Sequence, residues 1–373
     1  MILNDVCELI IDTEHKTAPN VEVGIPSIRT PNVGKGRLIL DKDIKYVDEP
    51  TFVQWTKRAI PRKDDLIIAR EAPVGNVALV PDIQLCLGQR TVLARPDKRK
   101  VSPSFLCYYL LSPKMQHKML SGSGGSTVAH LNMKDIRNLE LEQLPALPTQ
   151  IKIASILSAY DDLIENNLKR IKLLEEKAAL MYNSILVNLK ETRKVSLYEI
   201  ADIQMGYAFK AEEFNESGEG NPIIRIRDIP NQSTKSFTTQ EVESKYIIEK
   251  GDLLIGMDGE FHINEWLGQK GYLVQRVCRL RSKDPFYQSF LWQALIKPIK
   301  FYESTISGAT VAHLGKKHLE QIYLHIPDYS TSDMLVELNQ MRHLKINLSH
   351  QNFKLQEARD ILLPQLMNGE IEV

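Results

Sequence analysis

The sequence lacks several features that would assign it to a special class of protein. Its 373 residues include four scattered cysteines, Cys7, Cys86, Cys107 and Cys278, with no C-x-x-C pair. We therefore expect buried free thiols in a reducing compartment and no disulfide framework. The chain has no run of eighteen apolar residues, which argues against a membrane span. An acidic residue, Asp5, occurs within the first five residues and no basic leader precedes it, so we expect a cytoplasmic protein.

Motifs for catalysis and cofactor binding are also missing. The run SGSGGS at residues 121–126 lacks the Lys-Ser/Thr of a P-loop, and the nine histidines show no H-E-x-x-H or other ligand spacing. No Gly-rich loop accompanied by an Asn-Pro-Pro-Tyr-like motif indicates methyl transfer to a flipped base. These absences indicate no metal site and give no support for catalysis by this chain. The backbone of residues 121–126, with Ser126, is compatible with either a phosphate-binding nest or a hinge.

The net charge is zero, because 47 Lys and Arg balance 47 Asp and Glu, but the charge is unevenly distributed. Residues 90–140 contain nine basic and three acidic side chains, whereas residues 201–260 contain six basic and twelve acidic ones. The basic stretch is a candidate surface for an anion such as DNA. A solvated charged face is the alternative interpretation of the same pattern.

The sequence contains an internal duplication. The word TVAHL occurs at residues 127–131 and again at 310–314. Other pairs match in the same order: PSIR with PIIR, KDDLII with KGDLLI, and Gln89-Arg90 with Gln275-Arg276. Their separations shrink slowly from 196 to 183 residues, as two copies of one domain with loop deletions would give. A period this long excludes a solenoid and indicates tandem domains.

Each copy ends in a long amphipathic segment. From residue 150 to about 188, apolar residues alternate steps of three and four, which is the pattern of a coiled-coil seam, and Asn167 is its polar member. The prolines at 145 and 148 precede this predicted helix. A second, less regular seam runs from about residue 338 to Pro364, with Leu344 or Lys345 at one position. We expect the two helices to pair antiparallel.

The rest of each copy indicates a mixed fold. Residues 65–70, 76–80 and 91–94 in the first copy, and 223–226, 251–255 and 272–274 in the second, are predicted strands. Residues 104–119 and 288–302 are predicted helices. The fold class is therefore α+β, with two tandem-duplicated domains at 1–149 and 191–328. A helix at 150–190 and a distal helix with the tail at 329–373 follow them.

These motifs resemble a known family. The central run LPALPTQ at 144–150, with IASIL at 153–157 and DDLIE at 161–165, resembles the shared central region of specificity subunits of type I restriction–modification systems. DLIIAREAPVGN at 65–76 is similar to the motif inside that family's target-recognition domains. The segment 355–371 resembles the family's distal helix. The likeness covers essentially the whole chain, in the family's order.

The resemblance implies a non-catalytic subunit. Two target-recognition domains would each read one half of a bipartite double-stranded DNA target. The paired helices would set the spacing and bind two methyltransferase subunits, which restriction/translocase subunits then join. S-adenosylmethionine, ATP and Mg²⁺ would belong to those partners, and no membrane is involved.

We predict two sets of functional residues. The guanidinium group of arginine can donate two hydrogen bonds to guanine or to a phosphate. Basic residues flanked by glycine are typical of a loop that contacts the phosphate backbone. The predicted DNA-binding residues are Arg29, Lys35, Arg37, Arg70, Arg90, Ser126, Arg225, Arg227 and Arg276, each with a surface ion pair as the alternative. The predicted helix-pairing seam comprises Ile153, Leu157, Ile164, Asn167, Ile171, Leu174, Leu348, Asn352, Leu355 and Leu362. For His130 and His313, in the duplicated word, we favour a hydrogen-bonded structural role.

Two other functions stay open at this stage. The chain could be a stand-alone or other defence-system DNA-targeting protein of the same fold, without type I partners. It could also be a coiled-coil scaffold that binds no nucleic acid, an interpretation that the basic stretch disfavours and the acidic second copy favours.

Overall fold

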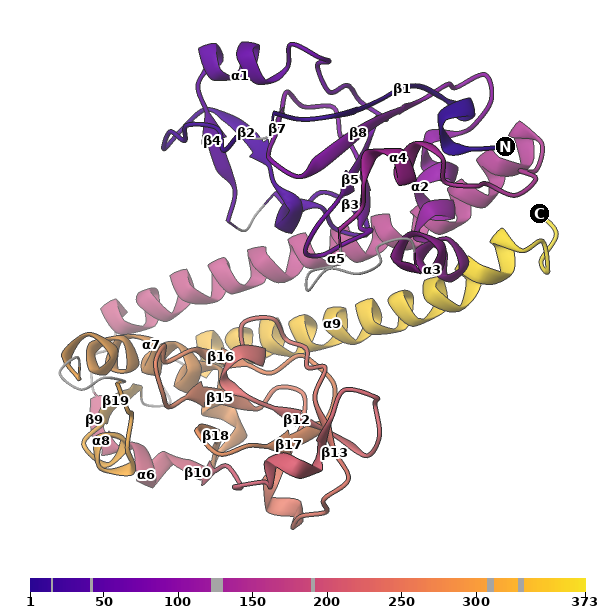
Figure 1. Ribbon diagram of the computed structural model, residues 1–373. Coiled ribbons are helices and arrows are strands. Elements are labelled where there is room, and N and C mark those ends of the chain that lie inside the picture. Colours follow the sequence, from indigo (N-terminus) through magenta and orange to yellow (C-terminus); the bar gives the residue numbers. More distant parts are fainter. Residues whose placement is uncertain (15, 41–42, 122–129, 189–191, 307–311, 328–331) are drawn as a thin grey trace. The chain divides into compact units, whose positions relative to one another are not determined.

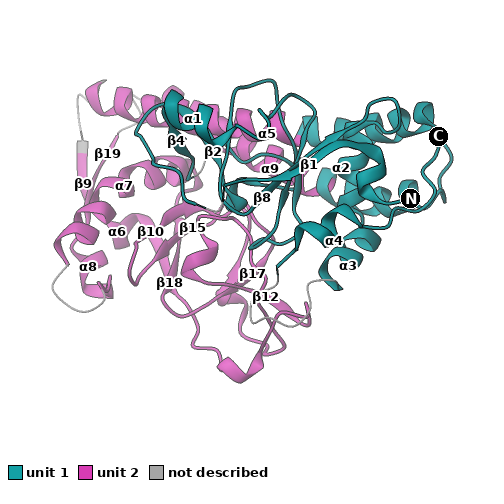
Figure 2. Ribbon diagram, turned by 45° about the horizontal axis from the view of Figure 1, so that its top comes forward, with its two compact units in different colours: residues 1–163, 355–373 teal, residues 164–354 magenta. Residues whose placement is uncertain are grey.

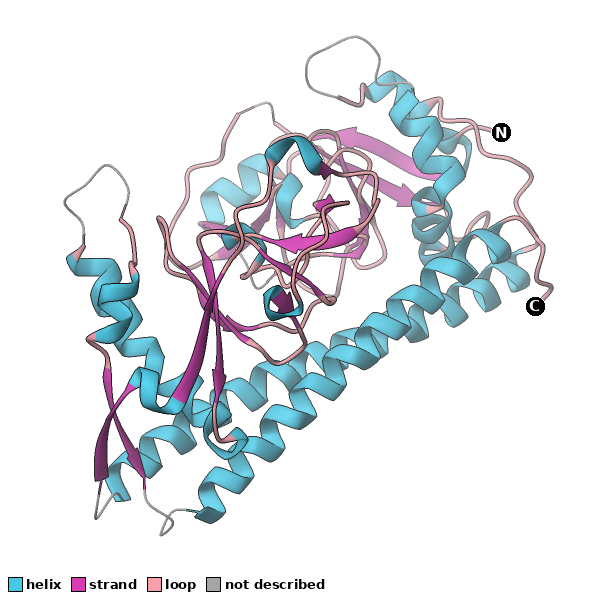
Figure 3. Ribbon diagram, turned by 90° about the horizontal axis from the view of Figure 1, so that it is seen from below, coloured by secondary structure: helices cyan, strands magenta, loops and turns pink. Residues whose placement is uncertain are grey.

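The computed structural model describes residues 1–14, 16–40, 43–121, 130–188, 192–306, 312–327 and 332–373. The chain divides into two compact units, which Figure 2 colours separately: residues 1–163 with 355–373, and residues 164–354. Each unit thus combines one of the duplicated domains with segments of both long helices. Both units contain strands as well as helices, and Figure 3 shows this mixed content, which confirms the predicted α+β class.

Unit 1 is built around a five-stranded sheet of order β1-β8-β5-β6-β3 and a three-stranded sheet of order β4-β2-β7. The strands are β1 (Cys7–Asp12), β2 (Ile25–Ile28), β3 (Gly36–Arg37), β4 (Lys45–Val47), β5 (Leu66–Ala69), β6 (Val77–Leu79), β7 (Cys86–Leu87) and β8 (Thr91–Pro96). Every residue of β5 is buried, as expected of a central strand with a continuous apolar run. The helices are α1 (Glu49–Trp55), α2 (Pro103–Leu111), α3 (Pro113–Ser121) and α4 (Met133–Arg137).

Unit 2 repeats this architecture with a four-stranded sheet of order β10-β18-β15-β16 and a five-stranded sheet of order β11-β13-β12-β17-β14. These strands are β10 (Ala201–Met205), β11 (Phe214–Asn215), β12 (Asn221–Ile224), β13 (Phe237–Thr238), β14 (Ile247–Ile248), β15 (Leu253–Gly256), β16 (Ile263–Glu265), β17 (Gly271–Leu273) and β18 (Val277–Ser282). A separate pair joins β9 (Thr192–Ser196) to β19 (Tyr323–Pro327). The helices are α6 (Leu197–Ile200), α7 (Gln288–Thr305) and α8 (Lys316–Glu320).

The strand registers confirm the duplication. In unit 1 Leu66 lies opposite Ala94, and in unit 2 Leu253 lies opposite Leu280. Both pairs are antiparallel, and both second strands are followed by a helix that packs on the sheet. The parallel pair β2–β7 is likewise repeated by β12–β17. The two copies therefore share topology and pairing as well as sequence words.

The long helices are α5 (Leu147–Asn188) and α9 (Ser332–Met367), which run side by side in opposite directions (Figure 1). Within unit 2, Asn167 contacts Asn352 while Lys177, further along α5, contacts Glu337, earlier in α9. This order confirms the antiparallel pairing. Among the predicted seam residues, Ile153, Leu157, Ile164, Asn167, Leu348 and Asn352 are buried, and Ile171, Leu174, Leu355 and Leu362 are half-buried.

Four helix boundaries differ from the sequence expectation. The helix α5 begins at Leu147, so Pro148 lies in its first turn, where the N–H that proline lacks would have no helical partner anyway. The predicted helix at 104–119 is two helices, because Ser112 before Pro113 adopts an extended conformation. The helix α7 runs on to Thr305, and α9 continues through Pro364 to Met367.

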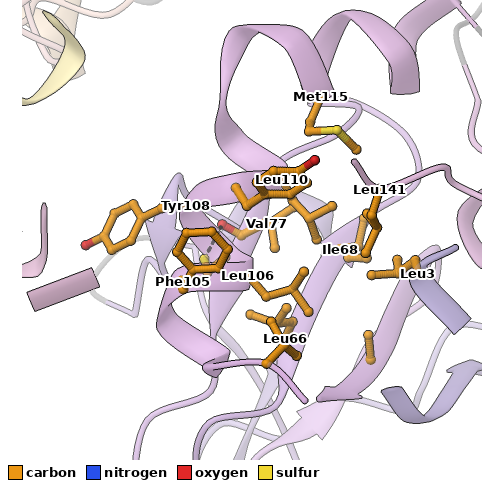
Figure 4. Close-up of a cluster of buried hydrophobic side chains, with 14 of the residues drawn as sticks. Leu3, Leu66, Ile68, Val77, Phe105, Leu106, Tyr108, Leu110, Met115 and Leu141 are labelled. Carbon is orange, nitrogen blue, oxygen red and sulfur yellow. Dashed lines mark hydrogen bonds between the residues drawn. The ribbon is translucent and has the colours of Figure 1, made fainter. Parts of the chain in front are cut away.

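The core of unit 1 joins its five-stranded sheet to both long helices. Figure 4 shows Leu66, Ile68 and Val77 from the sheet packed against Phe105 and Leu106 of α2. Side chains of α5 and α9 belong to the same cluster; they are Ile153, Ala154, Leu157 and Leu366. Burial of each large side chain contributes roughly 1.5–3 kcal/mol. The helices are therefore part of the folded unit.

The cysteines are free, as predicted, and three of them are buried while Cys7 is half-buried. Burial raises the pKa of the Cys278 thiol to about 12 and that of Cys86 to about 11. These thiols stay protonated at neutral pH and are poor nucleophiles.

Candidate functional site

The same three segments meet at one place in each unit. In unit 1 the Arg70 N–H, just after β5, donates to the Arg90 carbonyl, and the Leu131 N–H donates to the Arg70 carbonyl, both at 3.0 Å. In unit 2 the Met257 N–H donates to the Arg276 carbonyl at 2.8 Å, and Leu314 donates to Met257 at 2.7 Å. Arg90 and Arg276 are thus structurally equivalent, as are the histidines that precede Leu131 and Leu314.

In unit 1 these segments carry a charged cluster. Glu71 accepts a hydrogen bond from His130 Nδ1 at 3.0 Å and forms an ion pair with Arg90. Arg70 donates from Nη2 to His130 Nε2 at 2.8 Å and from Nε to the Leu131 carbonyl at 2.8 Å. Because a guanidinium can only donate, His130 Nε2 is the acceptor from Arg70, and Nδ1 is the donor to Glu71. We call Glu71, His130 and Arg90 the first cluster.

The equivalent residues of unit 2 form a matching cluster. Asp258 contacts His313 Nδ1 at 2.5 Å through one oxygen and Arg276 Nε at 3.2 Å through the other. Arg276 Nη1 also approaches the His313 ring at 3.3 Å. We call Asp258, His313 and Arg276 the second cluster. Both histidines are hydrogen-bonded to a carboxylate, as expected from the sequence.

The two arginines have an unusual backbone. Arg90 has φ of 66° and Arg276 has φ of 74°, in the left-handed region that favours glycine. Their side chains are 57% and 49% exposed, so each guanidinium is held at one end and open to solvent elsewhere. Residues in such conformations gather at functional sites.

The other predicted DNA-binding residues have different environments. Arg70 is buried and donates to His130 and Leu131, so its guanidinium is already engaged inside the unit. Arg37 forms an ion pair with Asp162 of α5, while Lys35 and Arg227 are exposed. Ser126 lies outside the described residues. These placements leave Lys35, Arg90, Arg227 and Arg276 as the most open of the predicted cations.

Arg29 and Arg225 are equivalent half-buried residues at the start of short 3₁₀ turns. Arg29 donates to the Asp43 carbonyl at 2.6 Å, and Arg225 contacts the Ser236 hydroxyl. Burial, with the neighbouring charge of Arg227, lowers the pKa of Arg225 below its usual value. Both guanidinium groups have structural contacts within their own unit.

Buried polar contacts attach each of the duplicated domains to the long helices. In unit 1, buried Asp161 of α5 accepts from the Tyr108 hydroxyl at 2.6 Å and from Arg359 of α9 at 2.6 Å. Burial and the Asp161 charge raise the pKa of Tyr108. In unit 2, fully buried Glu265 of β16 contacts Arg342 at 2.5 Å and Lys345 at 2.6 Å. The second seam therefore contains Lys345, whereas Leu344 is 40% exposed.

Sequence reasoning missed the acidic members of the clusters. Glu71 lies in the motif DLIIAREAPVGN, and Asp258 lies in a segment that looks dissimilar, but they are separated by 187 residues, the same as Asp65 and Asp252. That shared separation was the available signal. Asp65 and Asp252 are themselves equivalent, since each forms a two-point ion pair with an arginine of the neighbouring strand, Arg95 or Arg281.

Within the part of the chain that the structure describes, no group of three His, Cys, Asp or Glu side chains is placed to hold a metal ion. Among the same residues, no helix is both long and apolar enough to cross a bilayer.

The duplicated α+β units, the paired helices and the matching arginine clusters define a tandem domain protein. The family model for the type I restriction modification DNA specificity domain matches residues 2–176 and 190–347. The chain belongs to this family.

Proteins similar to this chain are named as specificity subunits of type I restriction enzymes. The EcoBI specificity subunit of Escherichia coli is 29% identical over 48% of this chain and 39% of that protein. The MjaIX specificity subunit of Methanocaldococcus jannaschii is 23% identical over 90% of this chain and 84% of that protein. A type I restriction-modification S subunit from M. genitalium has a similar fold, with a TM-score of 0.57 at 16% identity over 98% of this chain and 95% of that one.

Proposed function

We propose that this chain is the DNA specificity subunit of a type I restriction–modification complex and acts in the cytoplasm. Each recognition domain reads one half of a bipartite double-stranded DNA target. The antiparallel helices set the distance between the halves and hold two methyltransferase subunits, which restriction/translocase subunits join. S-adenosylmethionine, ATP and Mg²⁺ are bound by those partners.

The observation that carries this proposal is the repetition of one arginine cluster in both units. Two equivalent, half-exposed guanidinium groups are what a protein with two similar DNA-reading domains requires. A rigid spacer between two readers then enforces a fixed separation of the half-sites. A scaffold that binds no nucleic acid would have no use for the repeated cluster.

The outer surface of α5 supports protein partners over a stand-alone role. Several large apolar side chains of this helix are more than half exposed; they are Ile151, Leu163, Leu168, Leu173 and Leu180. The helix α5 already pairs with α9 through its other face, so its exposed apolar side chains are expected to contact a further protein. This favours the methyltransferase-docking role over a DNA-targeting protein without type I partners.

We expect the purified chain alone to transfer no methyl group to DNA and to cleave none. The described residues hold no metal-ligating cluster, and the sequence has neither a P-loop nor a methyltransferase motif. Methylation of a defined DNA sequence should appear only when a cognate methyltransferase subunit is added. Turnover by the pure chain that one of its own point mutations abolishes would contradict this expectation.

A domain exchange tests the modular reading of DNA. Replacing residues 1–140 with the recognition domain of another subunit should change one half of the target and leave the other half unchanged. The donor must supply a tyrosine equivalent to Tyr108, because Asp161 of the retained helix is buried and needs that partner. Methylation mapping of the reconstituted complex gives the result. A change in both half-sites would show that the domains do not read independently.

A further inference from the structure

We propose that Arg90 and Arg276 each read a guanine, one in each half of the target, and that the carboxylate–histidine pairs behind them are positioning residues. The pairs are Glu71 with His130 and Asp258 with His313. This inference rests on the proposed function and deepens it, because it assigns one equivalent base contact to each recognition domain.

The backbone is the first argument for a role of these side chains. A nearby pair of equivalent positions also has positive φ: Asp64 at 71° and Gly251 at 88°. There, one copy has the glycine that this conformation favours. At positions 90 and 276 both copies retain arginine in spite of the conformation. A site that needed only the turn would accept glycine, so the arginine side chain itself is required.

The geometry of the guanidinium groups is the second argument. Arg90 uses Nη1 for Glu71, and Arg276 uses Nε and Nη1 for Asp258 and His313. Within the described part of the chain, Nη2 of each arginine has no protein partner and lies on a half-exposed side chain. The carboxylate thus fixes the orientation of the fork and leaves donors directed to solvent. An arginine held in this way is organised for a partner before it binds.

The carboxylates favour a base over a phosphate as that partner. A phosphate placed against either cluster would meet Glu71 or Asp258 next to the arginine, and two anions repel each other. The O6 and N7 acceptors of guanine are uncharged and match the arginine fork. The equivalent clusters therefore predict a G·C pair at a corresponding position of each half-site.

The test uses the full chain in complex with its methyltransferase partner. The wild-type target is first selected from a randomised duplex DNA pool, and each variant is then selected from the same pool. We expect R90G to lose roughly ten- to hundredfold of the discrimination at one G·C pair of one half-site. R276G should do the same in the other half-site only. Because glycine suits the positive φ, neither variant should lower the melting temperature, so loss of reading is distinguished from unfolding.

The positioning residues have their own readout. E71Q should broaden the profile at the same base pair as R90G, because it removes the charge that holds the fork. E71D should preserve the profile, since Asp258 performs this role in the second domain. K316Q, which removes an exposed cation paired with Glu320, is the charge-matched control for R90G and R276G and should leave the profile unchanged.

Three results would overturn the inference. R90G could weaken binding to all sequences equally with a smaller salt dependence, which would assign Arg90 to a phosphate. It could leave the profile unchanged, or it could alter both half-sites. A wild-type complex that selects no bipartite sequence would instead refute the proposed function, so the two failures are distinguishable.

Discussion

Truncation after residue 190 is expected to convert the chain into a symmetric dimer that reads an interrupted palindrome. The fragment retains the first recognition domain and α5 but loses α9. Its seam, from Ile153 to Ile185, would then be exposed to water. Reburial of apolar surface contributes about 25 cal/mol per Å², which favours pairing of two seams against an association cost of roughly 4–15 kcal/mol.

The contacts of the intact chain indicate the register of that dimer. The Asn167 side chain donates to the Asn352 side chain at 2.9 Å, and these two residues are separated by 185 residues, as equivalent positions of the repeat are. In the dimer Asn167 would therefore meet Asn167 of the second copy, with Ile164 opposite Ile171 on either side. A polar pair within an apolar seam fixes register. The dimer loses the Arg359 contact to Asp161, so we expect it to be weaker than the intact pairing.

The substitution N167D distinguishes this register from others. In the truncated dimer it places two carboxylates opposite each other, and it should shift the fragment to monomer. In the full chain the same aspartate faces Asn352, whose amide can donate to it, so the full chain should stay folded and specific. Sedimentation reports the oligomeric state, and methylation mapping with the partner subunit reports the target. A stable monomeric fragment, or one with an asymmetric target, would refute the argument.

The fold was predictable because its strongest signals are periodic or repeated. The α5 seam follows the heptad spacing for almost its full length, and Asn167 stands out in it as the polar member. The shared words predict a pair of equivalent strands, which lie at 66–69 and 253–256. By contrast, the strands β9 and β19 pair residues about 130 positions apart, and no local pattern indicates that partner. Helix boundaries at Pro148 and Pro364 depended on whether proline is tolerated, which sequence spacing does not decide.

The candidate site was predictable only in part, because a side chain's partners depend on tertiary structure. Arginines such as Arg70, Arg90 and Arg276 were identifiable by type and by duplication. That Arg70 is buried while Arg90 is exposed follows from where the His130 segment crosses the end of β5. The role of Lys345 could not be predicted either. A lysine at a seam position is explained only by its ion pair with Glu265, and the sequence does not indicate that the two residues are in contact.

Breaking the Glu265 contact is expected to cause the largest loss of stability of any single substitution considered. Glu265 is fully buried, and Lys345 is 2% exposed. Glu265 contacts both Arg342 and Lys345, while Lys345 also lies 3.4 Å from Glu175 and 3.8 Å from the centre of the Trp292 ring. E265A leaves two cations in a low-dielectric site without their main counter-charge. Removing one partner of a buried ion pair costs about 3–5 kcal/mol.

Hydrogen exchange on residues 332–354 measures this loss within unit 2, together with urea unfolding. The control is E337A, which breaks the exposed pair of Lys177 and Glu337 between the same two helices and should cost about 1 kcal/mol or less.

The triple variant E265L/R342M/K345M removes the three main charges together. It should recover much of the stability, because no buried cation is then left beside an apolar site. If E265A were no more destabilising than E337A, the buried charges would not anchor α9 to the second recognition domain. If the triple variant were as unstable as E265A, the loss would come from side-chain packing and not from uncompensated charge.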